Sequence, residues 1–199
     1  FKVELRIQLE SESDGWQTAS TGRIKSIPNT PVLDGAVREE LLSVRERALA
    51  PYDQPVSNLC GPRFHCDWVL EDRERGAATK LALRSELSEE VSDYGLHPGI
   101  FDRCIHTLTE RFTGILLPYS CERLRIYGTL TSTTLSYGYQ REPGVDESLD
   151  IFMTDLEGNL LVEVEGYLAK DFESLTHQRA DAKEEVEYDR HVDHRMVLD

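Results

Sequence analysis

Apolar and polar residues alternate along most of this chain, which is the pattern of β-strands buried on one face. Alternating runs cover residues 2–9, 16–24, 67–70, 77–83, 123–127, 134–140, 149–154 and 160–168. Turn residues separate the first two runs at 14–15 and the last two at 155–159. Each of these two pairs is therefore predicted to form an antiparallel hairpin.

Two segments break the alternation and predict helices. Residues 37–49 place leucines and a valine among Arg and Glu, and Pro51 follows; this amphipathic helix is expected to pack at the joint between two halves of the chain. Residues 97–112 open with His97 and Pro98, and Pro98 is tolerated in a first helical turn because it has no N–H to lose. A helix among antiparallel strands predicts an α+β fold.

The second helix carries the candidate chemistry. Asp102 and His106 are four residues apart, so they lie on one helix face, where the imidazole is expected to hydrogen-bond the carboxylate and hold it in place. The apolar side chains of the same helix are expected to bury it, which would leave Asp102 at the edge of a cavity. These apolar residues are Ile100, Cys104, Ile105, Leu108 and Phe112. For an arbitrary pair at this spacing, a plain hydrogen bond or salt bridge on a half-buried helix is the commoner interpretation.

The sequence around this pair resembles a known family. Residues 97–106, HPGIFDRCIH, resemble the HPxxxDxxxQ/H motif in the second half of polyketide synthase dehydratase domains, which have a double hot-dog fold. Residues 60–64, CGPRF, resemble the YGPxF loop of that family. Leu117 and Pro118, with ERLRIYG at 122–128, resemble its LPxxxxxxRxxG strand, and residues 149–167 resemble the hairpin that closes the second hot dog. The resemblance covers residues 1–172.

The resemblance implies a fold and a domain plan. We expect a hot-dog fold, a curved antiparallel sheet wrapped around a central helix, forming the C-terminal part of a double hot dog. Residues 1–30 would end the first hot dog, 31–55 would connect, 56–172 would form the second hot dog, and 173–199 would be a charged linker or tail. The other catalytic motif of the family, HxxxGxxxxP, is missing, because no glycine stands four places after any of the six histidines. Since the chain starts within a strand at Phe1, we expect that histidine upstream of Phe1 in a longer polypeptide; the alternative is a degenerate domain that never had it.

By this resemblance the activity is that of a hydro-lyase. The domain would dehydrate a 3-hydroxyacyl thioester, carried on the phosphopantetheine of an acyl carrier protein, to a 2-enoyl thioester, without a metal or redox cofactor. A histidine base would take the proton beside the thioester carbonyl, and Asp102 would protonate the departing hydroxyl or orient the leaving water, with His106 orienting Asp102. Because the histidine is missing, the isolated chain is expected to be inactive.

The resemblance also assigns substrate-binding residues: Cys60, Gly61, Pro62, Phe64, His97, Pro98, Leu117 and Pro118. Phe64, Leu117 and Pro118 would line the acyl tunnel, with plain core packing as the alternative. Cys60 stands where the family loop has Tyr, so a phenolic hydroxyl is missing there. Three alternatives to a dehydratase stay open: a non-catalytic pseudo-dehydratase that acts as a structural or docking module, a pyran-forming cyclase, and a product-template domain.

Composition and charge limit the classes of partner that this chain is expected to bind. The net charge of −15 argues against nucleic acid, since phosphate binding needs Lys and Arg. No run approaches the ~18 apolar residues of a membrane span and no signal segment opens the chain, so a cytoplasmic protein without a membrane partner is expected. The four cysteines lack the spacing of a metal site or disulfide framework and are predicted to be reduced and mostly buried.

The expected partners are an acyl carrier protein, neighbouring domains of a modular megasynthase and a second copy in a homodimer. Arg123 with Arg125, or Arg45 with Arg47, are candidate docking patches, although solvated surface charge is the commoner role.

Overall fold

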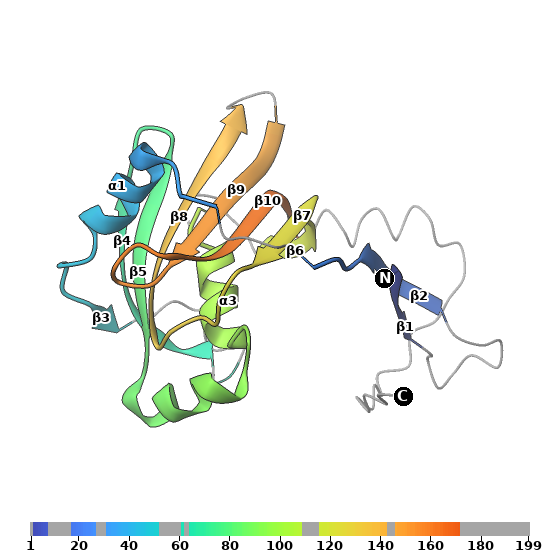
Figure 1. Cartoon of the computed structure of the whole chain (residues 1–199), viewed down its shortest axis with the longest axis horizontal. Coiled ribbons are helices and arrows are strands. Elements are labelled where there is room, and N and C mark those ends of the chain that lie inside the picture. The colour runs from blue at the N-terminus through green and yellow to red at the C-terminus, as the bar shows by residue number, and fades with distance from the viewer. Residues whose placement is uncertain are drawn as a thin grey trace. The chain divides into compact units, whose positions relative to one another are not determined.

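The computed structural model of the chain describes residues 2–7, 17–26, 31–51, 61, 64–108, 116–142 and 146–171. The chain divides into two compact units, Phe1–Pro28 with Gln178–Asp199, and Asn29–His177. In the first unit, β1 (Lys2–Ile7) pairs antiparallel with β2 (Gln17–Arg23) (Figure 1). The predicted first hairpin is therefore confirmed, while the turn predicted at 14–15 lies outside the described residues.

The second unit is built on one eight-stranded antiparallel sheet in the order β3-β4-β5-β8-β9-β10-β6, with β7 also paired to β10. Its strands are β3 (Ala50–Pro51), β4 (Cys66–Asp72), β5 (Gly76–Leu83), β6 (Leu116–Ser120), β7 (Arg123–Ile126), β8 (Thr133–Glu142), β9 (Asp146–Thr154) and β10 (Leu160–Asp171). All six alternating runs between residues 67 and 168 form strands, and the β9–β10 hairpin is confirmed. The alternation did not predict two strands, β3 and β6, which end the strand order of the sheet. Strand β3 has only two residues, and β6 contains Pro118.

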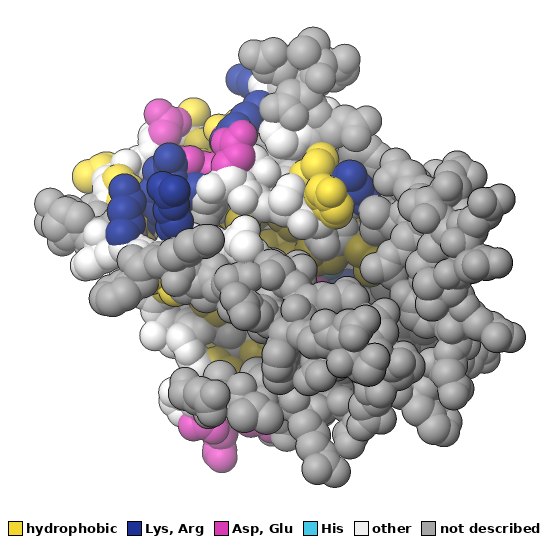
Figure 2. Space-filling model, turned by 90° about the vertical axis from the view of Figure 1, so that its right-hand side faces the viewer, with side chains coloured by type: hydrophobic (Ala, Val, Ile, Leu, Met, Phe, Trp, Pro, Cys, Tyr) yellow, Lys and Arg dark blue, Asp and Glu magenta, His cyan; other side chains and the backbone are white. Residues whose placement is uncertain are grey.

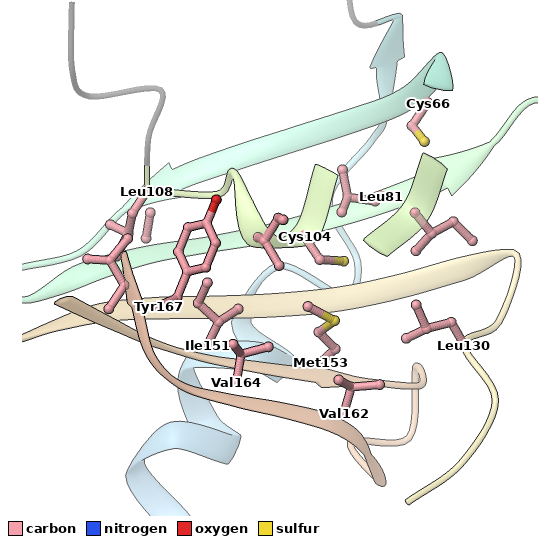
Figure 3. Close-up of a cluster of buried hydrophobic side chains, with 14 of the residues drawn as sticks. Cys66, Leu81, Cys104, Leu108, Leu130, Ile151, Met153, Val162, Val164 and Tyr167 are labelled. Atoms are coloured by element: carbon pink, nitrogen blue, oxygen red, sulfur yellow. The ribbon is translucent and has the colours of Figure 1, made fainter. Parts of the chain in front are cut away.

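Helix α3 (Pro98–Ile105) lies against one face of this sheet. It begins at Pro98 as predicted, but it ends at Ile105, and residues 106–108 form a turn; the rest of the predicted helix, with Phe112, lies outside the described residues. The helix buries Ile100, Cys104 and Ile105 against Met153 and Val162 of the sheet. Figure 3 shows Met153 and Val162 on the strands and Cys104 on the helix, within one cluster of buried side chains between the sheet and α3. The sheet and one central helix give the predicted α+β, hot-dog arrangement.

Helix α1 (Gly35–Ser43) covers the opposite face of the sheet. Its Leu41, with Val44 just beyond its end, packs against residues that alternate with those facing α3: Ala78, Leu135 and Tyr137. The predicted bounds of 37–49 were wrong. The helix begins earlier because the Asp34 carboxylate accepts hydrogen bonds from the first backbone amides, and it ends at Ser43. The predicted position of this helix at a joint between two halves of the chain stays a prediction.

Two ion pairs and one further helix complete the second unit. Arg73, after β4, donates to Glu40 of α1 at 2.6 Å and to Glu71 at 2.9 Å, which ties α1 to the β4–β5 turn. The 3-10 helix η2 (Ser85–Asp93), which the alternation did not predict, packs Leu87 and Val91 against the α3 core. Within the described ranges, no helix is long and apolar enough to cross a membrane.

Candidate active site

The first turn of α3 is fixed by its own backbone and by β4. His97 precedes the helix with only 1% of its surface exposed, and its ring meets the Tyr94 ring edge to face at 5.2 Å. The carbonyl of His97 accepts the Phe101 N–H at 2.9 Å. The Cys66 thiol lies 3.9 Å from the carbonyl oxygen of Gly99. The helix that carries Asp102 therefore starts from a buried, well-contacted turn.

Asp102 and His106 come together as the spacing predicted, but through a different hydrogen bond. The Nδ1 atom of His106 lies 2.7 Å from the backbone carbonyl oxygen of Asp102 and 3.5 Å from the nearer carboxylate oxygen. Because a carbonyl oxygen only accepts, Nδ1 carries the proton and donates it to the backbone. The predicted bond to the carboxylate is thus replaced by one to the Asp102 carbonyl oxygen, which also accepts the backbone N–H of His106 at 3.2 Å.

Arg103 is the neighbour of Asp102 that the sequence reasoning missed. Its Nη2 atom lies 3.5 Å from the second carboxylate oxygen of Asp102, and its side chain is only 6% exposed, against 23% for Asp102. The carboxylate therefore sits between an imidazole and a guanidinium at the edge of the buried core. An arginine inside an otherwise apolar helix face, directly after the acid, was the available signal.

Small polar side chains anchor the end of α3 to β8. Thr107 donates from Oγ1 to the Cys104 carbonyl at 2.8 Å, and Ser136 of β8 donates to the same oxygen at 3.3 Å. Burial raises the pKa of the Cys104 thiol well above its usual value and that of Cys66 to about 12. Both thiols therefore stay protonated at neutral pH and serve as packing groups rather than nucleophiles.

The other predicted substrate-binding residues are spread over the unit. Gly61 has a positive φ of 77° and its carbonyl accepts the Phe64 N–H at 3.2 Å, which makes a tight turn. Leu117 and Pro118 lie on the edge strand β6, opposite Lys170 and Ala169 of β10, and both are exposed. Cys60 and Pro62 lie outside the described residues. The binding roles of this set stay predictions.

The surface arginines are matched by acids. Arg123 and Arg125 on β7 bond the carboxylates of Glu165 and Glu163 on β10, at 2.7 and 2.9 Å. Figure 2 shows basic and acidic side chains lying beside one another on the face that it draws. The first proposed basic patch is therefore neutralised by the neighbouring strand. The same holds for the second, because Arg45 pairs with Glu46 at 2.8 Å and Arg47 pairs with Glu71.

The cysteines of the described ranges are free thiols. Cys66 and Cys104 are buried free thiols as expected, whereas Cys121 is exposed because it follows the edge strand β6. No set of three or more His, Cys, Asp or Glu side chains in the described ranges is arranged to hold a metal ion. Two of the residues in the charged tail that could be imagined as ligands, His191 and His194, lie outside those ranges.

Comparisons with known proteins agree on one family. A family model described as "Polyketide synthase dehydratase N-terminal domain" matches residues 58–179. No curated protein matches the chain.

Among solved structures, the chain is similar to a trans-AT PKS dehydratase domain from Brevibacillus brevis, with a TM-score of 0.68 and 19% identity over 86% of this chain and 64% of that one. It is also similar to an N-terminal dehydratase from the difficidin assembly line, with a TM-score of 0.61 and 16% identity over 90% of this chain and 70% of that one. A third similar structure is a bifunctional dehydratase-cyclase domain in ambruticin biosynthesis, with a TM-score of 0.61 and 17% identity over 92% of this chain and 66% of that one. The chain thus spans about two thirds of each of these structures.

Proposed function

Because the chain belongs to the polyketide synthase dehydratase family, we propose that it forms the aspartate-bearing part of a domain that dehydrates a 3-hydroxyacyl thioester to a 2-enoyl thioester. The observation that carries the proposal is the Asp102 carboxylate, set at the edge of the core on α3 and flanked by His106 and Arg103. A carboxyl group positioned beside a reacting hydroxyl can give it a proton as it leaves.

The reaction divides between two groups. A base takes the proton from C2 of the acyl chain, the electron pair of that C–H bond forms the C2–C3 double bond, and the C3–O bond breaks. Asp102 gives its proton to the departing hydroxyl, which leaves as water. His106 acts on this step indirectly, because its hydrogen bond to the Asp102 carbonyl fixes the end of the helix from which the carboxylate projects.

The base is proposed to be a histidine from the third of the domain that this chain does not span. Under this proposal the chain alone releases no enoyl product, and the active site is assembled only in the complete domain. No metal or redox cofactor takes part, because both steps are proton transfers. The domain boundaries 1–30, 31–55, 56–172 and 173–199, including assignment of the second unit to the second hot dog, stay part of this proposal.

The partners follow from the substrate. The acyl chain is proposed to arrive on the phosphopantetheine of an acyl carrier protein, within a homodimeric, cytoplasmic megasynthase. Since Arg123, Arg125, Arg45 and Arg47 are paired with acids, carrier docking on a basic patch would have to use other residues than these.

The test is an assay of the complete dehydratase domain that contains this chain, with a 3-hydroxyacyl thioester on its carrier protein. We expect loss of one water by mass spectrometry, and a decrease of about a hundredfold or more in Asp102→Asn. The matched control is Asp93→Asn, an exposed carboxylate at the end of η2, which should leave the rate unchanged. Full activity of Asp102→Asn, or no enoyl product from the unaltered domain, would refute the proposal.

One second function is favoured by a specific observation. The similar dehydratase-cyclase structure matches 92% of this chain, so a domain that closes a ring after dehydration is the alternative. A substrate with a second hydroxyl further along the acyl chain distinguishes the two: a dehydratase releases the open enoyl thioester, and a cyclase releases its cyclic isomer.

A further inference from the structure

Tyr167 is a buried phenol that no step described so far uses. It lies on β10 with 4% of its surface exposed and belongs to the same core cluster as Ile100, Cys104 and Leu108. Figure 3 shows its ring rising from β10 toward α3, with the hydroxyl at the far end of the ring from the strand. The side chain therefore spans the space between the sheet and the helix that carries Asp102.

A bulge in β10 sends this side chain inward. Val162 and Val164 face the core, so strict alternation would turn residues 166 and 168 inward and leave Tyr167 outside. The pairing of β10 with β9 instead shifts register between Val164 and Tyr167, where Gly166 has a φ of +61°. The Gly166 N–H donates to the Asp150 carboxylate at 2.9 Å, which holds the bulge in place. Bulges that re-aim one side chain are common next to active sites.

The Tyr167 hydroxyl is a donor that no acceptor in the described part of the chain contacts. Among the described residues it has no hydrogen-bond partner, and a buried polar group in that condition destabilises the fold. Burial, reinforced by the nearby negative charge of Asp102, raises its pKa far above the usual value. The hydroxyl is thus a donor at neutral pH that points from β10 toward the helix that carries Asp102, and a ligand oxygen held between the sheet and this helix would accept from it.

We propose that Tyr167 is a specificity-determining residue of this site, whose phenolic O–H donates a hydrogen bond to the 3-hydroxyl oxygen of the bound acyl chain. This assignment rests on the proposed function, since it places the substrate hydroxyl beside Asp102. Asp102 and Tyr167 would approach the same oxygen from α3 and from β10. The phenol then selects for chains that carry a hydroxyl at C3, and it fixes that hydroxyl before the C–O bond breaks.

The test separates binding from turnover by using probes that cannot be dehydrated. The complete domain is titrated with 2,2-dimethyl-3-hydroxybutyryl-pantetheine, which has no proton at C2, and with 2,2-dimethylbutyryl-pantetheine, which also lacks the hydroxyl. We expect the unaltered domain to bind the hydroxylated probe about five- to tenfold more tightly, about the effect of one net hydrogen bond, and Tyr167→Phe to lose most of this preference, because only Asp102 then contacts the hydroxyl. The control Tyr137→Phe removes a phenol from the opposite, α1-facing side of the sheet and should keep the preference.

The thermal midpoint gives a readout that a packing role would not share. Because the hydroxyl has no partner among the described residues, Tyr167→Phe should unfold at the same temperature as the unaltered domain or slightly higher. A preference that is undiminished in Tyr167→Phe, or is absent from the unaltered domain, would overturn the assignment. A preference that is lost in Tyr167→Phe while the unaltered domain releases no enoyl product would leave the assignment standing and refute only the dehydration.

Discussion

Asp150 offers the sharpest test of how the bulge in β10 is held. Its Oδ1 atom accepts two hydrogen bonds, from the Gly166 N–H at 2.9 Å and from Arg141 Nε at 2.8 Å, and the residue is 9% exposed. Asp150→Ala removes the shared acceptor of both bonds. The Gly166 amide is then left in the core without a partner, whereas Arg141 keeps the carboxylate of Glu122 at 3.0 Å.

The size of the effect follows from these contacts. An unsatisfied buried amide costs about 1–3 kcal/mol, and a partly exposed ion pair such as that of Arg141 adds about 1 kcal/mol. We therefore expect Asp150→Ala to lower the free energy of unfolding by about 3 kcal/mol. Glu122→Ala is the matched control, because it removes the other partner of the same arginine at a side chain that is 65% exposed, and it should cost less than about 1 kcal/mol.

The assay is urea unfolding of the purified chain and both variants, followed by circular dichroism of the sheet. The midpoint and its slope give the free energy of unfolding for each protein. If Asp150→Ala costs no more than Glu122→Ala, the buried carboxylate does not hold the bulge, and the explanation for the inward turn of Tyr167 is lost with it.

Two further predictions concern a backbone contact and the buried thiols. Gly76→Ala should destabilise the fold by at least about 2 kcal/mol, because the added Cβ would stand 2.1 Å from the backbone oxygen of Gly138. Gly95→Ala is the control and should cost far less, because a Cβ there would meet open space. Equal urea midpoints for the two variants would contradict this prediction. Raising the pH should weaken the fold, since the thiol of Cys66 ionises from about pH 9.0 in the unfolded chain and only at about 12 in the folded one, so the free energy of unfolding falls across that window. Cys104 acts in the same direction, and a urea midpoint whose alkaline decline is not reduced in Cys66→Ala would disprove the second prediction.

The strands were predictable because each depends on a local property of the chain. Alternation marked every long strand of the second unit, since one face of each strand is buried against a helix. The ends of α1 were not predictable from that pattern, because they depend on the Asp34 cap and on the turn at Val44. Strand β6 was missed as a separate strand because Pro118 interrupts its apolar pattern and its hydrogen bonds come from the distant β10.

The site was predictable only in part, for a related reason. The spacing of Asp102 and His106 gave their proximity, but the choice of the backbone carbonyl over the carboxylate depends on where the helix ends. The inward direction of Tyr167 was not predicted, because a register shift at Gly166 reverses which face of the sheet the next residue takes. Alternation alone cannot anticipate such a shift. The residues that sequence patterns miss are thus those whose direction is set by tertiary contacts.

In the second unit, α3 packs against one face of the sheet and α1 packs against the other. The sheet therefore separates two clusters of buried side chains from one another. Substitutions on the α1 side can change stability or surface properties while the acid on α3 keeps its surroundings, because no residue is shared between the two clusters. A reporter group attached to the exposed Ala36 of α1 would follow unfolding of this unit from the face of the sheet opposite α3, away from the side on which a substrate is proposed to bind.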